Sequence, residues 1–146
     1  MQDAIVREIT VKATQERVYQ AMTDPSEIIK WFPEAVEGGS LEVGQEPTFT
    51  FMDGQRRRRV IVVAANPNSY FAFRWAPGPD GLEEKHVMEL PNTLIEFHVE
   101  ALGENTKVTV KESGFASLPA DFASTTHDQN SGGWDYMFDR LSTLLK

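Results

Sequence analysis

The stretch that decides the fold is residues 130–145, NSGGWDYMFDRLSTLL. At about 100° per residue, its apolar side chains fall on one stripe and its charged side chains on the opposite side, which predicts a long amphipathic helix. The stripe consists of Trp134, Met137, Phe138, Leu141, Leu144 and Leu145. Because such a stripe has to be buried, the rest of the chain is expected to provide an apolar surface for the helix to cover.

That surface is predicted to be an antiparallel sheet. Apolar and polar residues alternate with the period of two that is typical of half-buried strands. The expected strands are residues 5–11, a segment around Phe49 and Phe51, residues 56–65, Tyr70–Trp75, residues 93–101 and residues 107–113. Hairpin turns at 53–54 and 103–105 indicate that neighbouring strands pair antiparallel. Residues 76–92 contain a Pro- and Gly-rich loop, and the sequence leaves the remainder of that segment open.

Two short helices are expected between the first strand and the rest of the sheet. One is capped by Thr14 and runs to Met22. The other has Asp24 as its N-cap and a proline at its first position, and should run to about Trp31. Strands and helices segregated in this way predict an α+β fold, with a curved antiparallel sheet, two short helices and a long C-terminal helix packed across it.

Length and composition favour one globular domain that spans residues 1–146. The formal net charge of -8 disfavours nucleic acid and anionic membrane as partners, so a neutral, weakly polar or cationic small ligand fits better. The chain has no cysteine and therefore no disulfide or thiolate chemistry. Its first residues, MQDA, lack the basic and apolar character of a signal peptide, so a cytoplasmic location is expected.

Several stretches in a fixed order point to a known family. They are residues 5–11, residues 16–25 followed by Trp31-Phe32-Pro33, Phe73-Arg74-Trp75, residues 108–115, and Gly133-Trp134 followed by Leu141. Together they resemble the START-like (SRPBCC) superfamily, and within it the bacterial homologues of the heat-shock-protein ATPase activator. The resemblance implies a helix-grip fold, with a cavity between the C-terminal helix and the sheet that binds small hydrophobic molecules in many relatives.

The candidate ligand-binding residues come from the expected sheet, the second short helix and the first half of the long helix. They are Trp31, Phe49, Phe51, Phe73, Trp75, Glu112, Asn130, Trp134, Met137 and Phe138. Burying a large apolar side chain contributes roughly 1.5–3 kcal/mol, so core packing alone also explains such residues. That alternative is favoured for Leu141, Leu144 and Leu145 in the later turns, and it stays open for the helix residues of the candidate set.

Glu112 is the candidate acid of the pocket. It shares strand parity with Val108 and Val110, so it would point inward if these valines do. It could then serve a cyclase- or hydratase-like enzyme as general acid or base. The alternative is that Glu112 lies near the strand end and reaches water.

The run of arginines at 56–59 is expected to follow a strand, where neighbouring side chains alternate between faces. The favoured interpretation is a solvated edge. If one alternating pair points inward, either Arg57 and Arg59 or Arg56 and Arg58 could meet a carboxylate of a ligand.

The sequence therefore favours binding or carriage of a small hydrophobic molecule. The alternatives are the enzyme described above and a chaperone ATPase-partner module, which ranks lower because no companion segment is visible. His86, His98 and His127 lack the spacing of metal ligands, so no metal and no other cofactor is expected. The expected partner is the small hydrophobic molecule, and a weak homodimer is left open.

Overall fold

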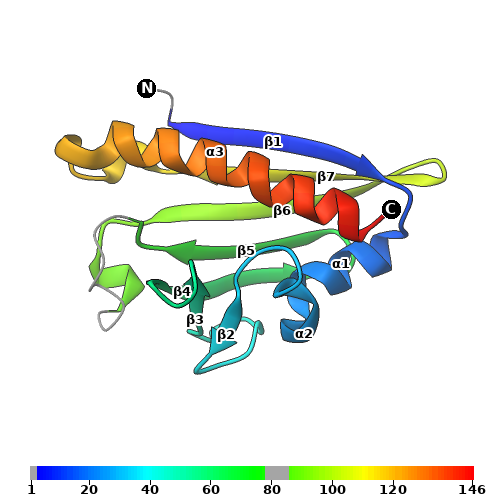
Figure 1. Cartoon of the computed structure of the whole chain (residues 1–146), viewed down its shortest axis with the longest axis horizontal. Helices are drawn as coiled ribbons and strands as arrows, with labels where there is room; N and C mark the ends of the chain where they lie inside the picture. The colour runs from blue at the N-terminus through cyan, green and yellow to red at the C-terminus, as the bar shows by residue number, and fades with distance from the viewer. Residues whose placement is uncertain (1–2, 78–85) are drawn as a thin grey trace.

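A computed structural model describes residues 3–77 and 86–146, and within them seven strands form one antiparallel sheet of order β1-β7-β6-β5-β4-β3-β2. The strands are β1 (Ala4–Val11), β2 (Ala35–Glu37), β3 (Thr48–Phe51), β4 (Arg56–Asn66), β5 (Tyr70–Trp75), β6 (Thr93–Leu102) and β7 (Asn105–Ser113). The register of β4 on β5 shifts between Val62 and Ala64, an irregularity of the kind that bends a strand and helps a sheet to curve. Figure 1 shows the sheet and the helix that crosses it.

The helical elements in the described part of the chain can be followed in Figure 1. They are α1 (Gln15–Thr23), α2 (Pro25–Ile28) and α3 (Ala120–Leu144), with the 3-10 turns η1 (Val87–Glu89) and η2 (Phe115–Ser117). The segment after α2 and the long helix α3 pack against the same face of this sheet, where both contact Phe97. The last half of α3 meets the segment after α2, where the rings of Trp31 and Phe138 lie 6.2 Å apart. Both rings also contact Phe97 of β6, which places α2, α3 and the middle of the sheet around one core. The predicted α+β helix-grip architecture is confirmed.

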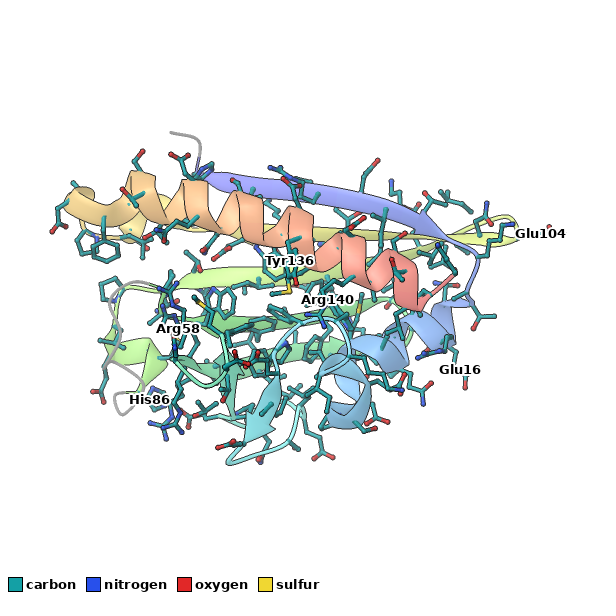
Figure 2. The ribbon with its side chains drawn as sticks, viewed as in Figure 1. Glu16, Arg58, His86, Glu104, Tyr136 and Arg140 are labelled. Atoms are coloured by element: carbon teal, nitrogen blue, oxygen red, sulfur yellow. The ribbon has the colours of Figure 1, made fainter. Side chains whose placement is uncertain are left out.

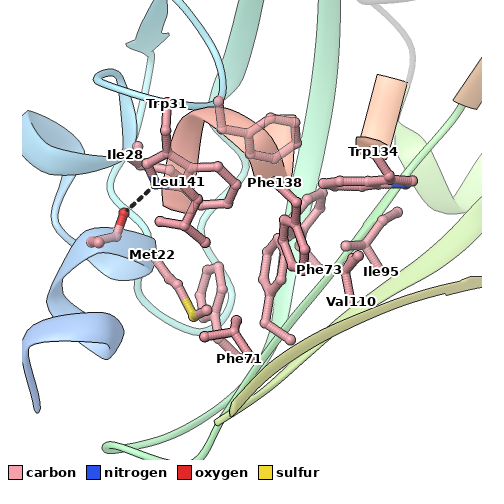
Figure 3. Close-up of a cluster of buried hydrophobic side chains, with 14 of the residues drawn as sticks. Met22, Ile28, Trp31, Phe71, Phe73, Ile95, Val110, Trp134, Phe138 and Leu141 are labelled. Atoms are coloured by element: carbon pink, nitrogen blue, oxygen red, sulfur yellow. Dashed lines mark hydrogen bonds between the residues drawn. The ribbon is translucent and has the colours of Figure 1, made fainter. Parts of the chain in front are cut away.

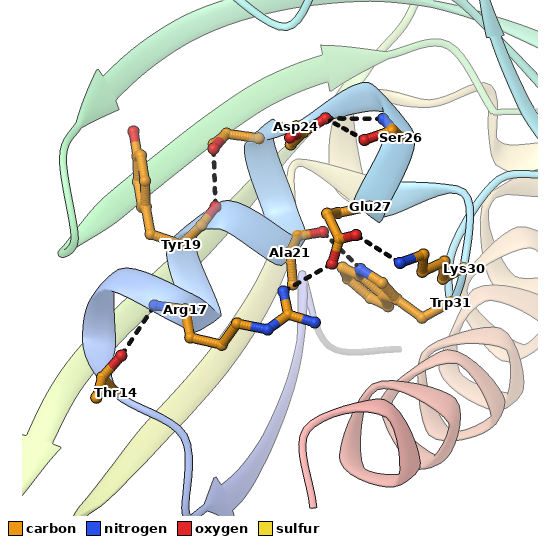
Figure 4. A network of polar contacts seen from close by, with 10 residues as sticks. Thr14, Arg17, Tyr19, Ala21, Asp24, Ser26, Glu27, Lys30 and Trp31 are labelled. Atoms are coloured by element: carbon orange, nitrogen blue, oxygen red, sulfur yellow. Dashed lines mark hydrogen bonds and ion pairs between the residues drawn. The ribbon is translucent and has the colours of Figure 1, made fainter.

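The two short helices are held by caps and by one tryptophan (Figure 4). The Thr14 hydroxyl accepts a hydrogen bond from the Arg17 amide at 3.1 Å, and Asp24 Oδ1 accepts one from the Ser26 amide at 2.9 Å. Trp31 Nε1 donates to the Ala21 carbonyl at 2.8 Å and so joins α1 to the turn after α2. Thr14 and Asp24 therefore cap the helices as the sequence predicts.

The core is a cluster of aromatic rings on the concave face of the sheet, closed by the later turns of α3 (Figure 3). Phe71, Phe73 and Phe97 on β5 and β6 are fully buried. From the helix, Leu141 is fully buried and Leu145 is 2% exposed, so both are core residues as predicted. The second half of α3 thus anchors the helix to the sheet.

Two expected helix bounds are wrong, and one strand was not expected. The second short helix ends at Ile28 instead of Trp31, and the chain continues as turns in which the Lys30 amide donates to the Glu27 carbonyl and the Trp31 amide to the Ile28 carbonyl. β2 is not predicted, since three residues are too few to show alternation. The long helix begins at Ala120, ten residues before the predicted start at 130. Its first turns bury few apolar side chains, so the apolar stripe that reveals the second half is absent there.

Tyr70 gives the fold a measurable dependence on alkaline pH. The pKa of Tyr70 is raised to about 12. The main cause is burial of its ring, and the second is the hydrogen bond that its hydroxyl donates to Glu96 Oε2 at 2.6 Å. A group whose pKa is raised on folding stabilises the fold below its unfolded pKa of about 10 and loses that contribution as the pH rises toward the folded value.

We therefore expect the urea midpoint of the wild type to fall more steeply between about pH 10 and pH 12 than that of Tyr70→Phe. Tyr136→Phe, which changes a ring that is 62% exposed, serves as the control and should keep the wild-type profile. Identical profiles for the wild type and Tyr70→Phe would contradict this assignment.

Candidate functional site

A pocket of about 520 Å³ lies between the first half of α3 and the end of the sheet formed by β3, β4 and β5. This size is within the range of sites that bind small organic molecules. Its described lining consists of Phe32, Phe51, Met52, Arg56, Arg58, Trp75, Pro77, Phe122, Thr125, Thr126, Gln129, Asn130, Gly133, Trp134 and Met137. The core thus fills the space under the second half of α3 and leaves a cavity under the first half.

One wall of the pocket is aromatic. The rings of Trp75 and Trp134 stack with centroids 6.1 Å apart and an interplanar angle of 29°. Phe32 lies 5.1 Å from Trp134, and Phe51 lies 6.3 Å from Trp75. These four rings come from β3, β5, α3 and the turn after α2, so the wall exists only in the folded chain. A planar apolar molecule could pack against it through dispersion and ring contacts.

Glu112 stands behind this wall and is fully buried. Its Oε2 accepts hydrogen bonds from Trp75 Nε1 at 3.0 Å and from the Thr93 hydroxyl at 2.6 Å. Its Oε1 accepts one from Trp134 Nε1 at 2.9 Å, and Asn130 Nδ2 lies 3.1 Å from each oxygen. The carboxylate therefore joins β5, β6 and β7 to α3.

This set of partners defines what Glu112 does. An indole N–H and an amide NH₂ can only donate, so the two carboxylate oxygens are used as acceptors. Trp75, Asn130 and Trp134 line the pocket, whereas Glu112 itself does not. The buried carboxylate consequently positions three pocket side chains, and it compensates its own burial through hydrogen bonds rather than through a cation.

Asn130 owes its orientation to the same network. Because Nδ2 is directed at the Glu112 carboxylate, the amide oxygen lies on the other arm of the side chain. Within residues 3–77 and 86–146, Asn130 Oδ1 accepts no hydrogen bond. It offers an acceptor of fixed direction at a residue of the pocket lining.

The structure distributes the ten predicted site residues over three places. Phe51, Trp75, Asn130, Trp134 and Met137 line the pocket, and Glu112 lies behind its wall. The others lie in the core and outside the pocket lining: Trp31, Phe49, Phe73 and Phe138. That any of these residues binds a ligand stays a prediction. The water-exposed alternative for Glu112 is wrong, because both of its neighbouring strands and α3 cover it.

Several lining residues were missed by sequence reasoning. Phe32 was overlooked in favour of its neighbour Trp31, although only Phe32 reaches the pocket. Phe122 and Thr126 were overlooked because the helix was expected to start at 130, and Gly133 because it has no side chain to mark it as a lining residue. A signal was present, since positions 122, 126, 130, 133 and 137 continue the inward stripe of α3 at helical spacing.

Two further findings concern other kinds of site. Among the described residues, no three His, Asp or Glu side chains gather as a group that could hold a metal ion. None of the helices in the described part of the chain has the length and apolar character needed to cross a membrane.

Residues 12–146 match the model of a family described as Activator of Hsp90 ATPase homolog 1-like protein. Among solved structures, protein MLL2253 from Mesorhizobium loti is 20% identical with a TM-score of 0.78, and the match covers 97% of this chain and 96% of that one. The Aha1 dimer from Colwellia psychrerythraea is 22% identical with a TM-score of 0.73, covering 99% and 96%.

DynU16, from the dynemicin biosynthetic locus, is 23% identical with a TM-score of 0.77. The match covers 99% of this chain but only 48% of DynU16, so the chain spans about half the length of that protein. None of the curated proteins matches significantly. At these identities the solved structures establish a shared fold.

Proposed function

The chain belongs to the family of Activator of Hsp90 ATPase homolog 1-like proteins, and from this premise we propose that it binds or carries a small hydrophobic molecule in the pocket beneath the first half of α3. The observation that carries the proposal is the aromatic wall, whose two tryptophans are both held by Glu112. Rings fixed in this way lose little freedom when a ligand packs on them, which favours binding.

The pocket suits an apolar body with few polar groups. Its described lining combines five aromatic rings with Met137 and with polar side chains at the α3 rim. Asn130 Oδ1 adds an acceptor for one donor of the ligand. A few fixed polar groups in an apolar cavity are the usual composition of a small-molecule site.

A neutral fluorophore tests this proposal. We expect Nile red to bind with one-to-one stoichiometry and to increase its emission, because the pocket removes it from water. Met137→Gln places an amide in the apolar lining and should weaken binding about tenfold. Met88→Gln makes the same change at a side chain that is 53% exposed and outside the lining, and it should bind like the wild type.

Absence of stoichiometric binding, or equal binding by Met137→Gln, counts against a pocket ligand. Native mass spectrometry of freshly purified protein complements the assay, since a retained molecule would reveal its mass directly.

The enzyme alternative is less well supported. A general acid or base has to reach the substrate, and the four side chains that donate to Glu112 cover both of its oxygens. Asp, Glu and His are absent from the described lining of the pocket. These contacts favour a positioning role for Glu112 over a catalytic one.

The family description supports a second candidate, a partner module of a chaperone ATPase. Stimulation of the ATPase of a purified bacterial Hsp90 by the chain, unaffected by Met137→Gln, would favour this candidate over the ligand carrier. The Colwellia relative is described as a dimer, so a weak homodimer is proposed as well, and sedimentation velocity over a range of concentrations tests it. A cytoplasmic location likewise remains a proposal.

A further inference from the structure

Two arginines of β4 face the pocket. Val60 and Val62 are buried on the concave side of the strand, and because side chains alternate, residues 56 and 58 share that side. Arg56 and Arg58 accordingly belong to the pocket lining, whereas Arg57 and Arg59 do not. The concave face of β4 therefore changes from apolar to cationic where the strand leaves the core and enters the pocket.

The pairing of β3 with β4 places these arginines beside the aromatic wall. Arg56 lies opposite Phe51 in the register, and Arg58 lies opposite Phe49. Phe51 is itself part of the wall, with its ring next to Trp75. In Figure 2, Arg58 is labelled below the first half of α3, and Arg58 and residues of that helix both line the pocket. A ligand in contact with the wall is therefore also close to a guanidinium.

The charges around the pocket are separated. Arg56 and Arg58 are the cationic side chains of the described lining, which contains no Asp or Glu. The negative charge of Glu112 lies on β7, and β5 and β6 separate that strand from β4. Three strand spacings of about 4.8 Å separate the backbones of β7 and β4 by about 14 Å along the sheet. The described lining of the pocket thus carries guanidinium groups at the β4 end and lies against a carboxylate at the α3 end.

We propose that the ligand is an amphipathic carboxylate, with its apolar body on the aromatic wall and its carboxylate at Arg56 and Arg58. This inference rests on the proposed function and specifies the chemical class of the ligand. The reverse orientation, with the carboxylate of the ligand at the α3 end, is disfavoured because it would bring that carboxylate close to the carboxylate of Glu112.

Arginine suits this role for two reasons. Its planar guanidinium can hold a carboxylate through two parallel hydrogen bonds, and its five donors allow a ligand contact in addition to contacts within the chain, such as the bond from Arg58 to the Arg57 carbonyl. The net charge of -8 predicts a neutral or cationic ligand. However, salt screens the electrostatic effect of surface charges beyond about 8–10 Å at physiological ionic strength. In the described lining of the pocket, the charged side chains are those of the two arginines.

A matched pair of probes tests the proposal: 2-naphthoic acid and its methyl ester, which differ by one charge on the same ring system. Quenching of tryptophan fluorescence reports binding, because Trp75 and Trp134 line the pocket. The wild type should prefer the acid over the ester. Arg58→Gln should weaken binding of the acid about tenfold and leave that of the ester unchanged. Arg57→Gln removes the same charge from the opposite face of β4 and should keep the preference of the wild type.

The outcomes separate this inference from the function on which it rests. Equal affinity of the wild type for acid and ester overturns the carboxylate proposal while leaving apolar binding intact. An equal loss in Arg57→Gln and Arg58→Gln also overturns it, because it would reflect net charge alone. Failure of both probes and of Nile red to bind refutes the pocket function itself.

Discussion

Glu112→Gln is expected to lower the free energy of unfolding by about 2–4 kcal/mol, which corresponds to a fall in Tm of about 10 °C for a chain of this size. Glutamate and glutamine side chains have nearly the same shape, so the lost stability comes from hydrogen bonding and not from packing. Glutamine keeps one oxygen but replaces the other with an NH₂ donor. Trp75 Nε1 and Trp134 Nε1 donate to different oxygens, so either orientation of the amide leaves one buried indole N–H facing a donor.

Urea unfolding of Glu112→Gln beside Glu100→Gln measures this loss. Glu100 lies on the neighbouring strand with its side chain 64% exposed, and its contact with Lys107 Nζ is 3.7 Å long. An exposed pair of this kind contributes little, so Glu100→Gln should remain close to the wild type. Equal midpoints for the two variants would show that the Glu112 network contributes nothing to stability.

A double-mutant cycle assigns the loss to a particular contact. Trp134→Phe removes one donor to Glu112, and its cost should be much smaller when residue 112 is already glutamine. Trp31→Phe removes another buried indole bond, which goes to the Ala21 carbonyl. Its cost should be the same with either residue at 112. Additivity of Trp134→Phe with Glu112→Gln would contradict the network.

Gly133→Phe is expected to weaken Nile red binding by more than about tenfold without destabilising the fold. A Cβ added at Gly133 meets no atom within 4 Å, and the residue belongs to the pocket lining. A phenyl group there would occupy the space of the ligand. Because glycine is unfavourable inside a helix, stability should rise by a few tenths of a kcal/mol.

Gly132→Phe is the matched control for this change. Gly132 is the preceding residue of α3, and a Cβ there also meets nothing within 4 Å, but it is exposed and outside the pocket lining. Both variants should gain the same helix propensity, and only Gly133→Phe should lose the probe. If both variants bind Nile red as tightly as the wild type, the dye does not occupy this pocket.

Much of the fold follows from local patterns in the sequence. Alternation and hairpin turns predict most strands to within two residues, and Thr14 and Asp24 predict where the short helices begin. The parity of Glu112 with Val108 and Val110 ties its direction to that of the two valines, and the burial of all three side chains decides between the two alternatives left open for Glu112. Where apolar and polar residues alternate regularly because one face packs on the core, the sequence predicts the position of a strand and the direction of its side chains.

The parts that could not be predicted depend on contacts between distant segments. Which of Trp31 and Phe32 reaches the pocket is decided by the turns after α2, and these have no periodic pattern. The choice between the two arginine pairs is different, because its signal is local: Val60 and Val62 share strand parity with Arg56 and Arg58, so the sequence alone could have indicated this pair. The first turns of α3 cover a cavity and bury few apolar side chains, so the sequence shows no apolar stripe there from which the helix could be predicted.

The division of α3 into two halves has a consequence for how such a protein can change over time. Leu141 and Leu145 hold the helix to the core, while residues such as Thr125, Gln129 and Gly133 border the cavity without belonging to that core. Substitutions in the first half can thus alter selectivity at little cost to folding. Under the proposed function, a few exchanges on a single helical face would change which molecule is bound, while the core residues of the same helix stay as they are.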